Sequence, residues 1–155
     1  MGKYFNFNEL IKSDTARKYN INNRPEEEAT INNINISIEK LDMIREEWTK
    51  HCSKHNLGNP SLIINSGYRC EKLNRAVNGS KTSEHLLGFA YDIDTANNQN
   101  KIFIEWLHDY LNENEILFSQ LINEKPDKNN NPSWIHLSFE GRHPNRYRCQ
   151  YFTIK

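Results

Sequence analysis

The feature that most constrains the fold is a long amphipathic segment early in the chain. Pro25 is followed by three glutamates, which predicts a helix start, because proline suits a first helical turn and acids suit the positive end of the helix dipole. Apolar residues then recur at spacings of three and four: Ile31, Ile34, Ile38, Leu41, Ile44 and Trp48. This spacing places them on one helix face, so we predict a helix that packs on the core.

The remaining pattern predicts shorter elements on both sides of this helix. We expect helices at residues 5–12 and 71–77, and strands at 61–65, 89–94, 116–124 and 133–139. Between the strands, a second amphipathic helix places its apolar residues on one side: Ile102, Phe103, Trp106, Leu107, Tyr110 and Leu111. Helices first and strands later indicate an α+β fold with a small, mainly antiparallel sheet and flanking helices. With 155 residues and no internal repeat, we expect a single domain spanning 1–155.

Composition excludes several classes of function. Lys and Arg number 20 and Asp and Glu number 20, so the chain lacks the basic field of a nucleic-acid binder. The sequence has no apolar run long enough to cross a membrane and no secretory leader pattern at its start, so we expect a cytoplasmic monomer. The three cysteines show no paired spacing, which argues against a disulfide framework. Cys70 follows Arg69, a setting that would suit a nucleophile, but a structural thiol is the more common role.

Histidine and aspartate side chains form the first candidate site. His85 is followed by Gly88 and by a predicted strand that carries Asp92 and Asp94 on the same face, with Ile93 on the other. Imidazole nitrogen and carboxylate oxygen are both ligands that suit Zn²⁺. On spacing alone, an ordinary surface or hydrogen-bonded histidine is the more common interpretation. The other histidines, His51, His55, His108 and His143, have no comparable setting.

The last predicted strand supplies a third candidate ligand. Its alternation directs Ile135, Leu137 and Phe139 into the core, and directs Trp134, His136 and Ser138 to the opposite face. His136 would then complete a His-Asp-His set with His85 and Asp92. Three protein ligands leave a fourth tetrahedral position for water, as in catalytic rather than structural zinc sites.

Four motifs in order resemble the D-alanyl-D-alanine carboxypeptidase family of zinc peptidases, including its small phage endolysin-like members. They are SGYR at residues 66–69, LNRAVNG at 73–79, SEHLLGFAYD at 83–92 and WIH at 134–136. The opening FNFNEL at 5–10 and SDTA at 13–16 also resemble the small phage-type members. The resemblance covers most of the chain and implies a hedgehog/DD-peptidase-like fold that acts on the stem peptides of peptidoglycan.

The resemblance also implies roles for matched positions. One Zn²⁺ per chain would be held by His85, Asp92 and His136. Arg69 would bind substrate or stabilise the negative charge that develops on the scissile carbonyl. We further assign substrate contacts to Ser83, Gln120 and Trp134, and a supporting contact to a ligating histidine to Asp94.

One position departs from the family pattern. Many members place the catalytic acid three residues before the last histidine ligand, where this chain has Ser133. Serine cannot serve as a general base, so we favour Glu124, which a hairpin would bring beside His136. Glu84 and Asp94 are weaker rivals for that role. An exposed Glu124 without a catalytic part is the simpler alternative.

Three functions compete at this point. The leading one is a peptidase that acts on peptidoglycan, as an endolysin that reaches the wall from the host cytoplasm after release. The second is a zinc-containing binding module without chemistry, which Ser133 keeps open. The third is a cytosolic dipeptidase acting on free D-Ala-D-Ala.

Overall fold

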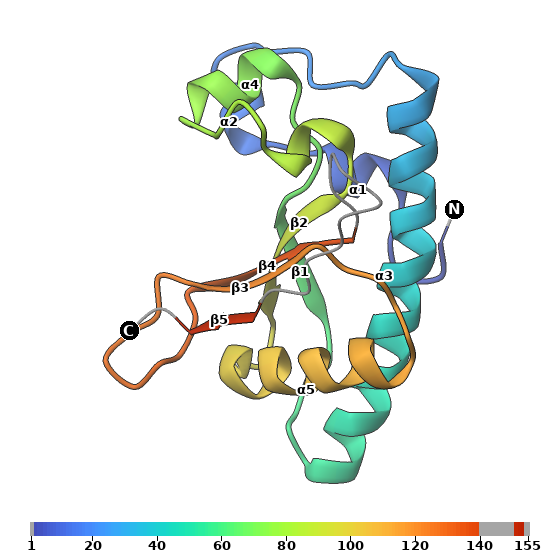
Figure 1. The fold of residues 1–155 in the computed structure, drawn as a ribbon, viewed down its shortest axis with the longest axis vertical. Helices are drawn as coiled ribbons and strands as arrows, with labels where there is room; N and C mark the ends of the chain where they lie inside the picture. Colours follow the sequence, from blue (N-terminus) through green and yellow to red (C-terminus); the bar gives the residue numbers. More distant parts are fainter. Residues whose placement is uncertain (1, 140–150, 154–155) are drawn as a thin grey trace.

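The computed structural model describes residues 2–139 and 151–153, and its centre is a five-stranded sheet flanked by helices (Figure 1). The strand order is β1-β2-β4-β3-β5. The strands are β1 Leu62–Ser66, β2 Ala90–Thr95, β3 Gln120–Glu124, β4 Trp134–Ser138 and β5 Tyr151–Thr153. The pairs β1–β2, β2–β4 and β4–β3 are antiparallel, whereas β5 pairs parallel with β3. The predicted α+β fold with a mainly antiparallel sheet is therefore confirmed.

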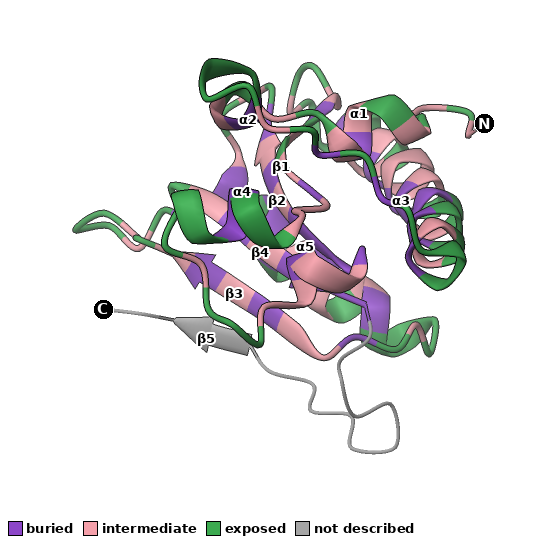
Figure 2. Cartoon of the chain, turned by 90° about the horizontal axis from the view of Figure 1, so that it is seen from above, coloured by how far each residue is buried: buried purple, intermediate pink, exposed green. Residues whose placement is uncertain are grey.

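Helix α3 (Glu28–His55) is the predicted core helix. Five of its six predicted apolar positions, from Ile34 to Trp48, are buried, while Ile31 is only half-buried. Figure 2 shows the helix with buried residues toward the rest of the molecule and exposed residues away from it. The helix begins three residues after Pro25, because the backbone at its N-cap Glu27 is still extended.

Helix α5 (Asn100–Glu113) crosses the sheet and completes the core. Phe103, Leu107 and Leu111 are fully buried, as expected. The prediction for Ile102 was wrong, since its side chain is 37% exposed and Ile104 is buried instead. Positions 103, 107 and 111 form one row at a spacing of four, and residue 104 flanks that row toward the core whereas 102 flanks it toward solvent.

Four short helical elements lie at the end of the sheet that carries the candidate ligands (Figure 1): α1 Phe7–Ile11, α2 Asp14–Lys18, α4 Glu71–Ala76 and the 3₁₀ helix η1 Glu84–Leu87. Ser13 caps α2, since its Oγ accepts a hydrogen bond from the amide of Ala16 at 3.1 Å. The end of α1 touches the end of β1 at Gly67, where an added Cβ would lie 2.2 Å from the carbonyl oxygen of Leu10. Glycine is therefore required for this close approach.

The strand edges differ from prediction mainly at β3. The sequence predicts a strand from 116, but pairing begins at Gln120. Phe118 is buried, and Ile116 packs against the core. The apolar residues of the segment that precedes β3 therefore reflect packing rather than strand pairing. None of the helices in the described residues is long and apolar enough to cross a membrane.

Candidate metal centre

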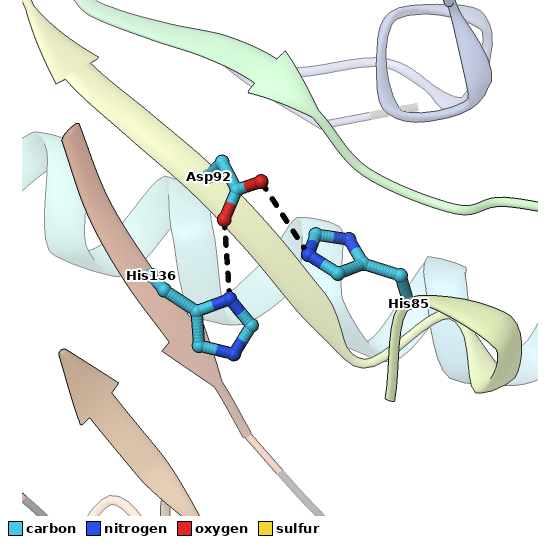
Figure 3. Close-up of side chains that lie close together, drawn as sticks. All are labelled: His85, Asp92 and His136. Carbon is cyan, nitrogen blue, oxygen red and sulfur yellow. Dashed lines mark hydrogen bonds and ion pairs between the residues drawn. The ribbon is translucent and has the colours of Figure 1, made fainter. Parts of the chain in front are cut away.

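Three elements bring His85, Asp92 and His136 together (Figure 3). Asp92 on β2 is the direct register partner of His136 on β4, so the two side chains leave the same face of neighbouring strands. His85 approaches from η1, which precedes β2. One potential ligand atom from each residue lies within 4.8 Å of the other two. The structure thus gathers the three residues that the sequence singled out as metal ligands.

The Asp92 carboxylate lies between the two imidazoles. Its Oδ2 is 3.5 Å from Nε2 of His85, and its Oδ1 is 3.1 Å from Nδ1 of His136. The other ring nitrogens have their own partners: Nδ1 of His85 is 2.7 Å from the carbonyl oxygen of Gly67, and Nε2 of His136 is 3.2 Å from Oε1 of Gln120. Both partners are oxygen acceptors, so these outer nitrogens carry the protons of neutral imidazoles.

This assignment leaves only lone pairs facing the centre. Nε2 of His85 and Nδ1 of His136 are then unprotonated, and both face a carboxylate that can only accept hydrogen bonds. Such an array is stabilised by a bound cation, and its mixture of two nitrogens and one oxygen suits zinc. The donor set therefore fits a zinc ion held by His85, Asp92 and His136.

Burial and charge tune the three groups for metal binding. The side chains are 4%, 14% and 12% exposed for His85, Asp92 and His136, so the centre is sheltered but still reachable by solvent. Burial lowers the pKa of His85, which keeps its imidazole neutral at pH 7. Burial alone would raise the pKa of Asp92, but in the metal-free protein the close polar contacts with the rings of His136 and His85 outweigh burial and lower the pKa below its ordinary value. Neutral imidazoles and an ionised carboxylate are the forms that bind metal.

The loop that carries His85 is held against α3. Gly88 ends η1 in the left-handed region with φ of +78°, and an added Cβ would lie 2.8 Å from Cγ1 of Ile34. Asn33 donates a hydrogen bond from Nδ2 to the carbonyl of Leu87 at 2.9 Å. Ser83, assigned to substrate binding, accepts a hydrogen bond at Oγ from the amide of His85 at 3.3 Å. That contact gives Ser83 a place in holding the ligand loop.

Arg69 lies beside the metal centre in a cradle of polar side chains. Its Nη2 is 3.5 Å from Oδ2 of Asp92. Its Nε donates to Oγ of Ser66 at 3.1 Å, and its Nη1 donates to Oδ1 of Asn74 at 3.2 Å. Burial lowers the pKa of Arg69 while Asp92 opposes that shift, and a guanidinium remains a cation at any physiological pH.

Sequence reasoning missed Asn74 and Ser66 as parts of this cradle. Asn74 is 3% exposed on α4 and also donates from Nδ2 to the carbonyl of Ser80 at 2.9 Å. An added Cβ at Gly79 would lie within 2 Å of the Asn74 amide oxygen, so the glycine makes room for it. A polar residue at a buried position of a short helix was the available signal, because buried amides need partners.

The residues considered for proton transfer lie on the strands around His136. Glu124 is opposite Trp134 in the β3–β4 ladder, and Ile122, two residues earlier, is opposite His136. Glu124 and His136 are therefore diagonal neighbours on one face of the hairpin. Ser133, at the position usual for the acid, donates from Oγ to the carbonyl of Lys125 at 2.7 Å.

Three of the assigned residues make contacts within the protein that the sequence did not predict. The carboxylate of Asp94 accepts from Nδ2 of Asn100 at 2.5 Å and lies 3.4 Å from Nδ2 of Asn65. Within the part of the chain that the structure describes, no hydrogen bond joins Asp94 to a ligating histidine. The ring of Trp134 stacks under Nζ of Lys125 at 5.5 Å. Gln120, assigned to substrate binding, also contacts His136, as described above.

Fold and site together define a small α+β protein with three side chains placed to hold a metal ion. The family model of peptidase M15 matches residues 3–120, three quarters of the chain, and the chain belongs to this family of zinc-dependent peptidases. The match contains Arg69, His85 and Asp92 but ends before His136, which the β-sheet register brings to the site. A comparison with curated proteins finds no match.

Proposed function

We propose that the chain is a zinc peptidase that hydrolyses peptide bonds in the stem peptides of peptidoglycan, as a D-Ala-D-Ala carboxypeptidase or an endopeptidase. The observation that carries this proposal is the convergence of His85, Asp92 and His136 beside the half-buried cation of Arg69. The peptidase M15 family supports the peptidase activity, and the ordered motifs from SGYR to WIH favour a cell-wall substrate.

The residues divide the chemistry between them. A zinc ion held by the three ligands would polarise the scissile carbonyl and lower the pKa of a bound water toward about 7. His85 and His136 act as neutral ligands whose orientation is fixed by Gly67 and Gln120. Arg69, held at a fixed angle by three polar neighbours, stabilises negative charge as it develops on the substrate oxygen.

Glu124 is the proposed proton acceptor. It lies on the same face of the β3–β4 hairpin as His136, and it is half-buried at the end of its strand. A carboxylate at this place accepts a proton from the attacking water and returns it to the leaving amine. Trp134, its register partner, lies where it would contact the substrate, together with Gln120 and Ser83 near the two histidines.

A narrower part of the proposal concerns the biological role. The similarity of residues 5–10 and 13–16 to small phage-type members favours an endolysin that works as a monomer on the host wall after release. A cytosolic D-Ala-D-Ala dipeptidase would use the same centre on a smaller substrate. A binding module is favoured by one observation, the occupation of the usual acid position by Ser133, whose hydroxyl is bonded to the backbone of Lys125.

The test is to incubate the zinc-loaded protein with intact sacculi, defined muropeptides and free D-Ala-D-Ala, with and without a chelator, and to identify products by mass spectrometry. Chelator-sensitive release of peptide from sacculi supports the proposal, and the mass lost identifies the bond. Cleavage of the free dipeptide alone would establish the dipeptidase. Tight zinc binding without any product would contradict the peptidase proposal and favour the binding module.

The same assay tests the proton acceptor. Glu124→Gln removes the basic oxygen and keeps the size of the side chain, so we expect kcat to fall by roughly 100-fold or more while zinc content stays at that of the parent. Glu113→Gln, at the exposed end of α5, is the matched control. An unchanged kcat in Glu124→Gln would remove Glu124 from the mechanism without affecting the assignment of the ligands.

A further inference from the structure

A second pair of histidines lies near the C-terminal end of α3. His51 and His55 are one helical turn apart, and their ring centroids are 4.3 Å from each other. His55 is exposed and His51 is half-buried. Among the residues that the structure describes, we find no hydrogen bond to either imidazole. Two adjacent ring systems with free nitrogens are thus presented on one face of the helix.

The pair is well separated from the metal centre already described. The ligand loop packs on α3 at Ile34, and His51 follows seventeen positions later in the same helix. At a rise of about 1.5 Å per residue, this places the pair roughly 25 Å along the helix from that contact. A ligand at His51 and His55 would therefore occupy a separate site.

Aromatic packing holds one member of the pair in place. The His51 ring is stacked on Trp48 with centroids 5.6 Å apart, and lies 5.9 Å from the ring of Trp106 on α5. Burial lowers the pKa of His51, with further contributions from His55 and Lys54, so its imidazole is neutral at pH 7. A restrained, neutral imidazole loses little conformational freedom when it binds a metal ion.

We propose that His51 and His55 form a chelate site for a divalent late transition-metal ion, in which Cu²⁺ binds most tightly and Zn²⁺ more weakly. Histidines at positions i and i+4 share a helix face, which is the arrangement that lets two imidazoles bind one ion. The order of the metals follows the general preference of nitrogen sites among divalent ions. The inference does not depend on the proposed peptidase function.

The ring separation favours copper geometry. A metal–nitrogen bond of about 2.0 Å plus a ring radius of about 1.2 Å places an ion about 3.2 Å from each ring centre. When each ring turns one nitrogen toward the same ion, the centroid separation of 4.3 Å corresponds to an angle of about 85° at the ion, close to the right angle between neighbours in tetragonal Cu²⁺ sites. Water would complete the coordination, because among the described residues no third side chain of a ligand type joins this pair in one cluster.

The position of two tryptophans provides a direct readout. Trp48 and Trp106 both contact the His51 ring, whereas Trp134 lies on β4 beside the first metal centre. We would titrate metal-free protein carrying Trp134→Phe with Cu²⁺ and follow tryptophan emission, which bound copper quenches at short range. Emission then reports on the α3 pair alone. We expect saturable quenching.

Two variants decide the outcome. His55→Gln removes one imidazole from an exposed position without disturbing the packing of His51. We expect the apparent affinity for Cu²⁺ to fall by about 100-fold, because the chelate effect of two ligands held on one helix is lost. His108→Gln, on α5 with no histidine one turn away, is the matched control and leaves the curve unchanged. Identical curves for His55→Gln and its parent would overturn the proposal.

Equilibrium dialysis against Zn²⁺ gives a second, independent measurement. The wild-type chain binds two equivalents at saturating zinc, and His55→Gln binds one. A second equivalent that survives in His55→Gln would also overturn the proposal. If His85, Asp92 and His136 do not bind zinc, the variant Asp92→Asn will bind as many equivalents of zinc as the wild-type chain. The outcome for this centre is therefore distinguishable from the outcome for His51 and His55.

Discussion

Gln120 contacts the candidate metal centre at His136, where its Oε1 lies 3.2 Å from Nε2. Loss of this acceptor frees the His136 ring to rotate and to change tautomer, so we expect Gln120→Ala to lower zinc affinity by about 10- to 100-fold. Competition with a chromogenic chelator measures the effect. Gln120→Glu, which keeps an oxygen acceptor, should restore most of the affinity, and Gln99→Ala serves as a control. Unaltered affinity in Gln120→Ala would return Gln120 to the role of a substrate contact.

Asn74 acts on Arg69 rather than on the metal ligands. Asn74→Ala removes the acceptor for Nη1 of Arg69 and the donor to Ser80, so we expect kcat to fall by roughly 10-fold with zinc affinity unchanged. Loss of the two hydrogen bonds made by the buried Asn74 amide costs about 1–3 kcal/mol of unfolding free energy. Steady-state kinetics and zinc binding should be measured together. The exposed neighbour Arg75→Ala is the control, and a drop in zinc affinity without a change in kcat would contradict this role.

At the scale of elements, Gly88 links η1 to α3. Gly88→Ala places a Cβ 2.8 Å from Ile34 at a φ of +78°, so both backbone strain and overlap destabilise it, by about 2–4 kcal/mol in total. Gly58→Ala has a similar φ of +84°, but its Cβ meets only Asn97 at 3.8 Å, so backbone strain alone acts there, at about 1 kcal/mol. Urea denaturation gives the loss of unfolding free energy in each variant, and the difference between the two losses measures the contribution of the overlap with Ile34. Equal losses would mean that the η1–α3 contact adds nothing.

Much of the element plan could be predicted because its signals are local. Alternation along β4 was enough to direct His136 away from the core, even though this strand lies beyond the residues that match the family model. The cradle around Arg69 was not predicted, although Ser66 and Asn74 lie only three and five residues from Arg69, because the path of the loop between β1 and α4 determines that their side chains meet. The prediction that Ile102 is buried was wrong because the side of the apolar row on α5 that is buried depends on the layer packed against the helix, which the sequence of the helix does not show.

At the scale of the whole molecule, the metal-free protein should lose stability in acid in two stages. His85 has a folded pKa below that of the unfolded chain, about 6.5. Below that pH the unfolded state takes up the proton first, and this uptake stabilises the unfolded state relative to the folded one. Asp92 also has a lowered folded pKa, so its contribution is complete above the unfolded value of about 3.9 and is lost as the pH falls through the folded value. Both shifts have the same sign, and stability therefore rises with pH in each window.

Chemical denaturation of metal-free protein between pH 7.5 and 3 measures this dependence. We expect the unfolding free energy to fall between pH 7 and 5, and to fall again below pH 4. His85→Gln should make the first stage smaller, because the substituted side chain does not titrate, while the lowered pKa of His51 still contributes in this window and His108→Gln should leave the stage in place. Saturating zinc should move the first stage to lower pH, since the ion competes with protons for the same nitrogens. A free energy that is constant between pH 7 and 5 would contradict the buried, neutral state of His85, on which metal binding at this centre depends.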